Sequence, residues 1–322
     1  MVKTYPGDPP FFPGFRTLDV EAGGVRFAGV TGGTGSPLLL LHGFPETHIA
    51  WRKVALALAA QHRLVIPDLP GYGASRTYAA TPRWTKRRVG EALVALMRTL
   101  GHERFALAGH DRGARAGYRL VLDHPGMVMR FASLAVVPTL DALGAADHRF
   151  AQANYHWFLL AQAAPLPETV LAATADVVLD REFASKGAAG ETAIEAAARD
   201  AYRAAFRDPA VHHAMCEDYR AALDEDLLND ATDRAAERRL DCPVLVLSSH
   251  GQIVLGRPSP TEIWKAWAND VTGAITTGGH FQPEDRPAEV VASLLPFFGA
   301  AAGPEADALI SSNRTAGSFG AW

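Results

Sequence analysis

The sequence predicts an α/β fold, in which a mostly parallel sheet is flanked by helices and carries an inserted helical cap. Short β-branched or aliphatic runs alternate with longer helical patterns, and strands that alternate with helices typically pair in parallel. Between residues 139 and 240 the strand pattern disappears, and Ala-rich amphipathic segments replace it. A chain of 322 residues has room for one large core of this kind together with a cap.

The strands of the core are expected where apolar runs of strand length occur. These runs cover residues 37–41, 63–67, 105–109, 131–137, 243–248 and 271–277. Within the cap, residues 191–207 and 212–228 have the spacing of amphipathic helices. The predicted parts are a core at 1–138 and 241–300, a cap at 139–240, and a loosely ordered tail at 301–322.

The composition is that of an ordinary globular protein. Hydrophobic residues make up 48% of the chain and charged residues 20%, which disfavours disordered, fibrous and nucleic-acid-coating classes. A formal net charge of -4 gives no bulk attraction for a polyanion. Prolines interrupt the apolar runs near the start, no run approaches the roughly 20 residues that span a bilayer, and the 2 cysteines suit a reducing compartment. We expect a cytoplasmic protein without a nucleic-acid partner, membrane partner, cofactor or metal.

A sharp turn between a strand and a helix is predicted around Asp111. The buried-strand run stops at Gly109, and the small residues Gly113 and Ala114 open a helical stretch. Small neighbours make room for a strained central residue, which is the setting of a nucleophile elbow. Asp111 could instead be only the N-cap of the helix, because Asp is favoured immediately before a helix. The surrounding motifs favour the nucleophile.

Three further motifs follow predicted strands. They are His42-Gly43-Phe44-Pro45, the stretch from Asp68 to Ser75, and Gly279-His280-Phe281. With them, the chain resembles the α/β-hydrolase superfamily from about Arg16 to Phe298, and the order of nucleophile and histidine matches that family. No G-x-S-x-G is present, so a serine esterase or lipase is disfavoured.

An aspartate nucleophile resembles the dehalogenase and epoxide hydrolase branches of that superfamily. The resemblance implies that Asp111 displaces a leaving group at saturated carbon and becomes an alkyl ester, which water activated by His280 then hydrolyses. It also implies that the backbone N–H groups of Phe44 and Arg112 form the oxyanion hole for the second step. Asp111 and His280 are therefore the expected catalytic residues.

Two arginines close to Asp111 indicate an anionic substrate. Arg112 and Arg115 lie near the start of the predicted helix, where backbone N–H groups add to the positive field. The guanidinium fork matches a carboxylate and would hold an α-halo acid in line with the attacking oxygen. The alternative is that both are surface arginines, or that they only neutralise Asp111.

Two cap segments, from Tyr155 to Glu168 and from Met215 to Arg220, closely resemble the fluoroacetate (haloacetate) dehalogenases. In that family the equivalents of His156, Trp157 and Tyr219 donate hydrogen bonds to the departing halide. Three N–H or O–H donors can replace the water around fluoride, a small and strongly hydrated leaving group. Taken singly, each of these residues would more often be a packing residue. The resemblance implies a 2-halo carboxylate substrate and suggests a homodimer.

One residue of the family pattern is missing. The third catalytic residue there is an aspartate three positions before the proline that ends the sixth strand, and Ala135 stands at this position. The alternative slot, 247–252, also lacks a carboxylate, and Asp141 is the nearest candidate substitute. The acid fixes the histidine tautomer and stabilises the imidazolium, so its loss should slow ester hydrolysis more than alkylation.

Three functions stay open. The first is a haloacetate dehalogenase, either fully active or slowed at ester hydrolysis, that yields glycolate and halide. The second is an epoxide hydrolase or another hydrolase with an aspartate nucleophile. Arg112 argues against it because an apolar residue usually follows the nucleophile there, whereas Tyr155, Tyr202 and Tyr219 could protonate an alkoxide. The third is a non-catalytic, carboxylate-binding homologue.

Overall fold

The computed structural model of the chain describes residues 9–187, 194–253 and 256–299. The predicted tail at 301–322 lies outside these residues, as does the first part of the predicted helical segment 191–207.

Nine strands of the described residues form one mixed sheet. They are β1 (Arg16–Ala22), β2 (Val25–Gly32), β3 (Ser36–Leu41), β4 (His62–Pro67), β5 (Arg76–Thr77), β6 (Phe105–His110), β7 (Val128–Leu134), β8 (Val244–Ser249) and β9 (Val271–Thr276). Their spatial order is β1-β2-β4-β3-β6-β7-β8-β9, and β5 pairs with β2. The pairs that involve β2 are antiparallel, and all the others are parallel. The predicted mostly parallel α/β fold is thus confirmed.

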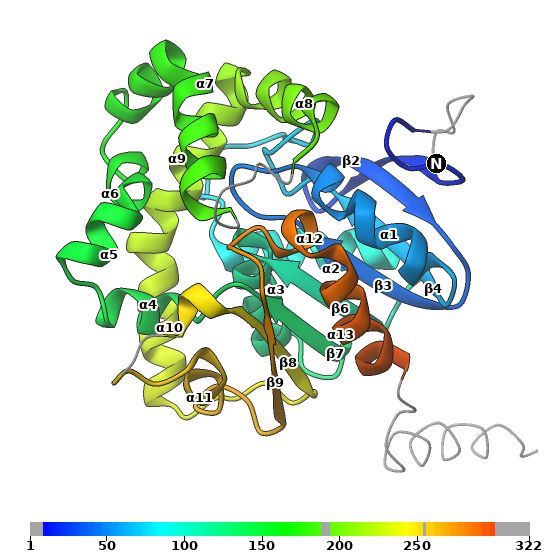
Figure 1. Ribbon diagram of the computed structural model, residues 1–322. Coiled ribbons are helices and arrows are strands. Elements are labelled where there is room, and N and C mark those ends of the chain that lie inside the picture. The colour runs from blue at the N-terminus through cyan, green and yellow to red at the C-terminus, as the bar shows by residue number, and fades with distance from the viewer. Residues whose placement is uncertain (1–8, 188–193, 254–255, 300–322) are drawn as a thin grey trace, which may run out of the picture.

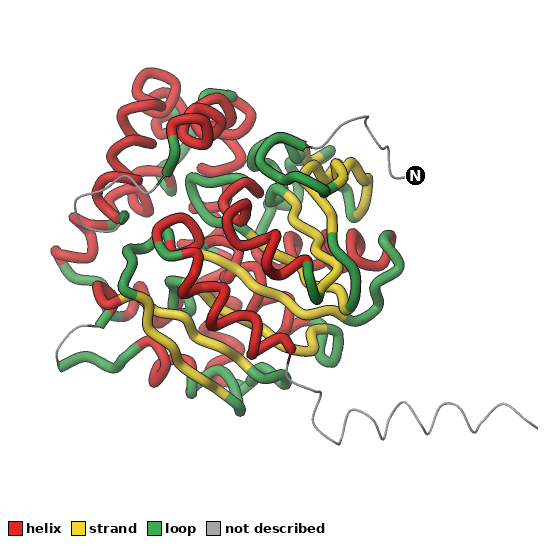
Figure 2. Tube along the Cα trace, turned by 45° about the vertical axis from the view of Figure 1, so that its right-hand side comes forward, coloured by secondary structure: helices red, strands yellow, loops and turns green. Residues whose placement is uncertain are grey.

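Helices cover both faces of this sheet and form a separate group beside it. Those of the core are η1 (His48–Trp51), α1 (Arg52–Ala59), α2 (Lys86–Thr99), α3 (Arg112–Asp123), η2 (His250–Gln252), α11 (Pro260–Trp264), α12 (Gln282–Asp285) and α13 (Pro287–Gly299). The others, here called the cap helices, are α4 (Thr139–Gly144), α5 (His148–Ala153), α6 (Tyr155–Leu160), α7 (Leu166–Lys186), α8 (Ala196–Phe206), α9 (Pro209–Leu223) and α10 (Glu225–Ala235). In Figures 1 and 2 the cap helices gather on one side of the sheet.

Two elements differ from the sequence-based expectation. The strand predicted at 131–137 is β7, which begins earlier and ends at Leu134 because Ala135 turns the chain with a φ of 63°. The helix predicted at 212–228 is two helices, because the backbone of Asp224 leaves the helical region with φ −124° and ψ −96°. The remaining predicted strands lie within two residues of their expected bounds.

The sheet brings distant parts of the chain to one edge. β6 and β8 are wholly buried, and β3 is buried from Leu38 onward, as expected for apolar strands covered by helices on both faces. The carboxyl ends of the parallel strands meet at the same edge, where α/β proteins bind ligands. Phe44, Asp111, Ala135 and His280 follow β3, β6, β7 and β9 in turn, so this edge collects them.

Candidate active site

Asp111 occupies the predicted turn between β6 and α3. Its φ of 48° and ψ of −114° lie outside the regions that L-residues usually adopt, and its side chain makes no capping hydrogen bond to α3. The turn is tight, since a Cβ atom on Gly109 would lie 2.5 Å from the Ala114 nitrogen, and one on Gly113 would lie 2.5 Å from the His42 carbonyl oxygen. The simple N-cap interpretation is therefore wrong, and the geometry is that of an elbow.

The carboxylate of Asp111 is held between a backbone donor and a histidine. Phe44 donates its backbone N–H to Oδ1 at 2.9 Å, and Nε2 of His280 lies 3.6 Å from Oδ2, too far for a hydrogen bond. Burial alone would raise the pKa of Asp111, but His280, His110 and Arg112 together hold that pKa well below its usual range. The carboxylate is buried, with Asp111 only 7% exposed, and it lines the cleft described below.

His280 has no acidic partner of its own. Among the described residues, the only carboxylate within 4 Å of its ring nitrogens is that of Asp111. Asp141 does not substitute for the missing acid, because it accepts hydrogen bonds from Arg234 and Trp267, both at 2.7 Å. Burial, together with the neighbouring ring of His110, lowers the pKa of His280 to about 3. Its imidazole is therefore neutral at physiological pH.

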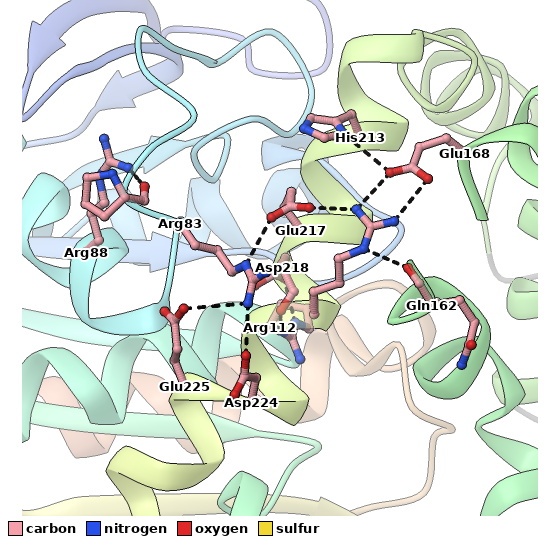
Figure 3. Close-up of polar contacts among 12 residues, drawn as sticks. Arg83, Arg88, Arg112, Gln162, Glu168, His213, Glu217, Asp218, Asp224 and Glu225 are labelled. Carbon is pink, nitrogen blue, oxygen red and sulfur yellow. Dashed lines mark hydrogen bonds and ion pairs between the residues drawn. The ribbon is translucent and has the colours of Figure 1, made fainter. Parts of the chain in front are cut away.

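The two arginines beside the elbow are buried and only partly paired. Arg112 donates from Nε to Oδ2 of Asp218 at 2.7 Å and from Nη2 to the Asp218 carbonyl oxygen at 3.0 Å (Figure 3). Arg115 donates from Nη1 to Oγ1 of Thr139 at 2.9 Å. Nη1 of Arg112 and Nε of Arg115 are buried without a hydrogen-bond partner in the described chain. Neither residue is a surface arginine, and each keeps an N–H that could donate a hydrogen bond to an anion.

The three predicted halide donors come together although they lie on different helices. His156 and Trp157 belong to α6, Tyr219 belongs to α9, and the Tyr219 ring lies 5.6 Å from the His156 ring and 6.2 Å from the Trp157 ring. The ring of Phe44 stacks on His156 at 5.3 Å. Guanidinium carbons of the two arginines lie 4.5 Å from the Tyr219 ring and 4.7 Å from the Trp157 ring. These contacts join the predicted donors to the elbow.

Several contacts at the site involve residues that the sequence motifs did not predict. Nδ1 of His110 lies 2.8 Å from a Glu46 carboxylate oxygen, and its Nε2 donates to the His280 carbonyl oxygen at 2.8 Å. Asp218 pairs with Arg112, and Glu182 pairs with Lys186 at 2.9 Å. His110 and Asp218 adjoin predicted residues within their motifs, which was a usable signal. Nothing in the sequence marked Glu46 or Glu182.

An open cleft of about 1180 Å³ leads to the elbow. Its walls include Asp111, Arg115, Ala135, Trp157, Lys186 and His280. Arg112, His156 and Tyr219 lie behind this wall and are at most 2% exposed. The cleft exceeds the roughly 300–1000 Å³ typical of pockets for drug-sized ligands, so a small substrate and water fit in it together.

Residues 9–187, 194–253 and 256–299 contain no group of three His, Cys, Asp or Glu side chains arranged to hold a metal ion. No helix within these ranges is both long and apolar enough to cross a membrane.

Comparison with known proteins supports the resemblance drawn from the motifs. The family model of the alpha/beta hydrolase fold matches residues 36–287. A fluoroacetate dehalogenase of a Burkholderia species is 37% identical over 289 residues, which cover 89% of this chain and 94% of that protein. A soluble epoxide hydrolase of a Corynebacterium strain is 30% identical over 85% of this chain and 94% of its own length.

A solved structure is also similar to this chain. A mutant protein from Pseudomonas aeruginosa, named for a proposed epoxide hydrolase activity and solved with bound MFA, is 46% identical to this chain. It superimposes with a TM-score of 0.86 and covers 90% of this chain and 98% of its own. The similarity to fluoroacetate dehalogenases that the sequence motifs predicted is confirmed.

Proposed function

The chain belongs to the α/β-hydrolase fold family and is an enzyme, and we propose that it hydrolyses 2-halo acids such as fluoroacetate to glycolate and halide through an ester of Asp111. Fluoroacetate dehalogenase is the name of its Burkholderia relative, with which it shares most of its length. The contacts around Asp111 support the same reaction for this chain.

One observation carries the proposal: two buried guanidinium nitrogens without partners flank a buried carboxylate on an elbow. Leaving a buried N–H unpaired costs about 1–3 kcal/mol each, and more when the group is charged. Nη1 of Arg112 and Nε of Arg115 therefore favour a bound anion, and the proposed ligand is the carboxylate of the substrate. The sequence-based prediction had both arginines bind the substrate carboxylate through their guanidinium forks. Arg112 does not fit that prediction, because two of its three guanidinium nitrogens already donate to Asp218.

The first step is displacement at the carbon next to the substrate carboxylate. Oδ2 of Asp111 attacks that carbon, the carbon–halogen bond breaks, and its electron pair leaves with the halide. His156, Trp157 and Tyr219 are the proposed halide pocket. Because the pKa of Asp111 is held low, its carboxylate is ionised at neutral pH.

The second step is hydrolysis of the ester. His280 takes a proton from water, the hydroxide adds to the Asp111 carbonyl carbon, and the N–H groups of Phe44 and Arg112 stabilise the oxyanion on Oδ1. The intermediate then collapses, the bond from that carbon to the ester oxygen breaks, and glycolate leaves with the proton that His280 returns. The new carboxyl group of Asp111 loses its proton to solvent, which restores the carboxylate. The 2.9 Å hydrogen bond from Phe44 to Oδ1 supports this role. Without an acid at Ala135, the imidazolium lacks its usual stabilisation. We therefore propose that ester hydrolysis limits turnover.

Intact-mass spectrometry after mixing with fluoroacetate tests both steps. The expected result is fluoride release together with an ester adduct of glycolate that builds up before steady state. Asp111→Asn is the control, and we expect neither adduct nor fluoride from it. Absence of both products from the wild-type chain would contradict the proposed function.

Epoxide hydrolysis is the second candidate, because Tyr155 lines the cleft and could protonate an alkoxide. Diol formation from a small epoxide, without halide release from any halo acid, would favour it. A third outcome, tight binding of glycolate without turnover of either substrate, would indicate a non-catalytic carboxylate-binding protein.

A homodimer and a cytoplasmic location complete the proposal. Cys216 and Cys242 are both buried and unpaired, which suits a reducing compartment. Light scattering coupled to gel filtration measures the mass of the particle in solution, and a monomer would contradict the dimer.

A further inference from the structure

A chain of hydrogen bonds connects Arg115 to a buried acid through two hydroxyl groups. Nη1 of Arg115 donates to Oγ1 of Thr139 at 2.9 Å. That oxygen lies 3.3 Å from the Tyr118 hydroxyl, which donates to Oδ2 of Asp230 at 2.7 Å. All four residues are at most 3% exposed. Arg115 and Tyr118 belong to α3, Thr139 to α4 and Asp230 to α10, so the chain of hydrogen bonds alternates between the core and the cap helices.

Each hydrogen bond in this chain has a fixed direction. A guanidinium only donates, so Oγ1 of Thr139 accepts from Arg115. Burial raises the pKa of Asp230 to about 6, so its carboxylate is ionised at neutral pH and only accepts. Tyr118 therefore gives its one proton to Asp230, and the Thr139 hydroxyl donates to the Tyr118 oxygen. The chain runs from a cation to an anion, and both hydroxyl protons are used in it.

Arg112, the other candidate substrate arginine, is held in a different way. It donates directly to Asp218, whereas no carboxylate of the described residues lies within 4 Å of the Arg115 guanidinium nitrogens. Burial lowers the pKa of both guanidinium groups, but the contact with Asp218 raises that of Arg112 well above its usual range, while that of Arg115 stays lowered. Arg115 also lines the cleft beside Asp111. Its charge is therefore less neutralised than that of Arg112.

We propose that Arg115 selects a negatively charged substrate, and that Thr139, Tyr118 and Asp230 are positioning residues that orient it without neutralising it by direct contact. The inference rests on the 2-halo acid substrate proposed above and assigns the side chains that make its charge matter. Coulomb energy falls with distance, so an acid two hydroxyl groups away competes less with the substrate carboxylate than an acid in contact would. Successive hydrogen bonds polarise one another, so Asp230 still strengthens the bond that orients Arg115.

Thr139→Val tests this, because it removes the acceptor of Arg115 and keeps a side chain of similar shape. The quantity measured is the second-order rate constant for ester formation on Asp111, followed by intact-mass spectrometry. The substrates are chloroacetate and chloroacetamide, in which a neutral amide replaces the carboxylate. A hydrogen bond to a charged group contributes a factor of about 10 or more. We expect the preference for chloroacetate to fall about 10-fold in Thr139→Val, and the rate with chloroacetamide to stay near the wild-type value.

Three further variants make the test specific. Thr139→Ser keeps the hydroxyl and should keep the preference. Thr276→Val removes an equally buried hydroxyl, whose contact is the Ser248 carbonyl oxygen at 3.4 Å, and should react like the wild type with both substrates. Tyr118→Phe breaks the chain one step further from Arg115 and should reduce the preference less than Thr139→Val does. An unchanged preference in Tyr118→Phe would remove Tyr118 and Asp230 from the assignment.

The outcomes that contradict the proposal are distinct. Equal slowing with both substrates would mean that Thr139 only supports the shape of the cleft. An unchanged preference in Thr139→Val would leave selection by charge to Arg112.

Calorimetric titration with glycolate separates this proposal from the dehalogenase function. If the wild-type chain formed no ester from chloroacetate, the proposed function would fail. Weaker binding of glycolate by Thr139→Val than by the wild type would still support the role of the hydrogen-bond chain, and equal binding would overturn it.

Discussion

Ala135 has a φ of 63°, in the left-handed region that residues with a Cβ atom adopt at a cost. Among residues with a Cβ atom, asparagine and aspartate tolerate this conformation best, because their short polar side chains can hydrogen-bond locally. Ala135 also lines the cleft with His280. The backbone at the end of β7 would thus accept an aspartate at this position.

Ala135→Asp should therefore accelerate ester hydrolysis without destabilising the fold. An acid that orients the histidine and stabilises the imidazolium contributes on the order of 100-fold or more. Single-turnover decay of the ester, followed by intact mass, measures the rate. The asparagine of Ala135→Asn suits the same backbone but cannot ionise, so the ester of this variant should decay at the wild-type rate. Equal acceleration by both substitutions would argue against a role for the charge.

The pH dependence of ester decay provides a second test at the residue scale. Because the pKa of His280 is lowered to about 3, its imidazole is the free base at any pH above that value. We expect the decay rate of the wild-type ester to stay constant between about pH 5 and pH 8, since the base form is already complete there. In Ala135→Asp the added carboxylate raises the pKa of His280, so the rate should fall as the pH drops through the new value. A wild-type midpoint near the ordinary histidine pKa of about 6.5 would contradict this.

At the scale of single elements, α9 connects the cap helices to the core through Asp218. This carboxylate accepts from Arg112 of α3 at 2.7 Å and from the Tyr72 hydroxyl at 2.9 Å, and it also pairs with Lys86 of α2. Its neighbour Glu217 instead meets Arg83 near the surface (Figure 3). A single buried side chain thus holds one of the two candidate substrate arginines.

Asp218→Asn should destabilise the protein by about 3–5 kcal/mol, because it leaves two buried cations without their counter-charge. It should also raise KM for the halo acid, since Arg112 loses the partner that orients it. Denaturant unfolding and steady-state kinetics measure the two effects. Glu217→Gln, one residue away and more exposed, should change both little. If the two variants behaved alike, Asp218 would not have the role assigned to it.

The elements differ in how well sequence predicts them. β3, β4, β6 and β8 were found because their buried stretches read as continuous apolar runs. β9 is mostly exposed or half-buried, and its β-branched residues indicated a strand. β1 and β2 were missed, since their partly exposed faces interleave polar residues with apolar ones. The break at Asp224 was missed because both flanking segments are good helix formers.

The residues of the candidate site also differ in how well the sequence predicts them. Asp111, His280 and the two arginines could be found because each belongs to a local motif next to a strand end. The pairing of Arg112 with Asp218 joins residues 106 apart in the chain, and that of His110 with Glu46 joins residues 64 apart. Such contacts depend on how the cap helices and the sheet pack, which no local spacing reveals.

At the scale of the whole molecule, buried neutral histidines connect stability to pH. Burial lowers the pKa of His42 to about 4 and that of His280 to about 3. In the unfolded chain both rings titrate near pH 6.5, so below that value the unfolded state binds protons that the folded state does not. Their contribution to stability is therefore complete above about pH 6.5 and is lost as the pH falls toward the folded values.

We expect the free energy of unfolding to be lower at pH 5 than at pH 7, by about 2 kcal/mol for each of these two histidines. Denaturant titrations at the two pH values measure the difference. His42→Gln should reduce the difference, whereas substitution of the exposed His213 should not. Equal stability at pH 5 and pH 7 would show that these rings are charged in the folded protein.

The left-handed turn at Ala135 also affects how many changes in sequence would give this chain a complete set of catalytic residues. The main chain at the end of β7 would need no insertion, deletion or repacking to present an acid. In the genetic code two of the four alanine codons become aspartate codons when their second base changes. If Ala135 is encoded by one of these two codons, a single point mutation separates the two forms, and selection for faster release of product could act on it in one step.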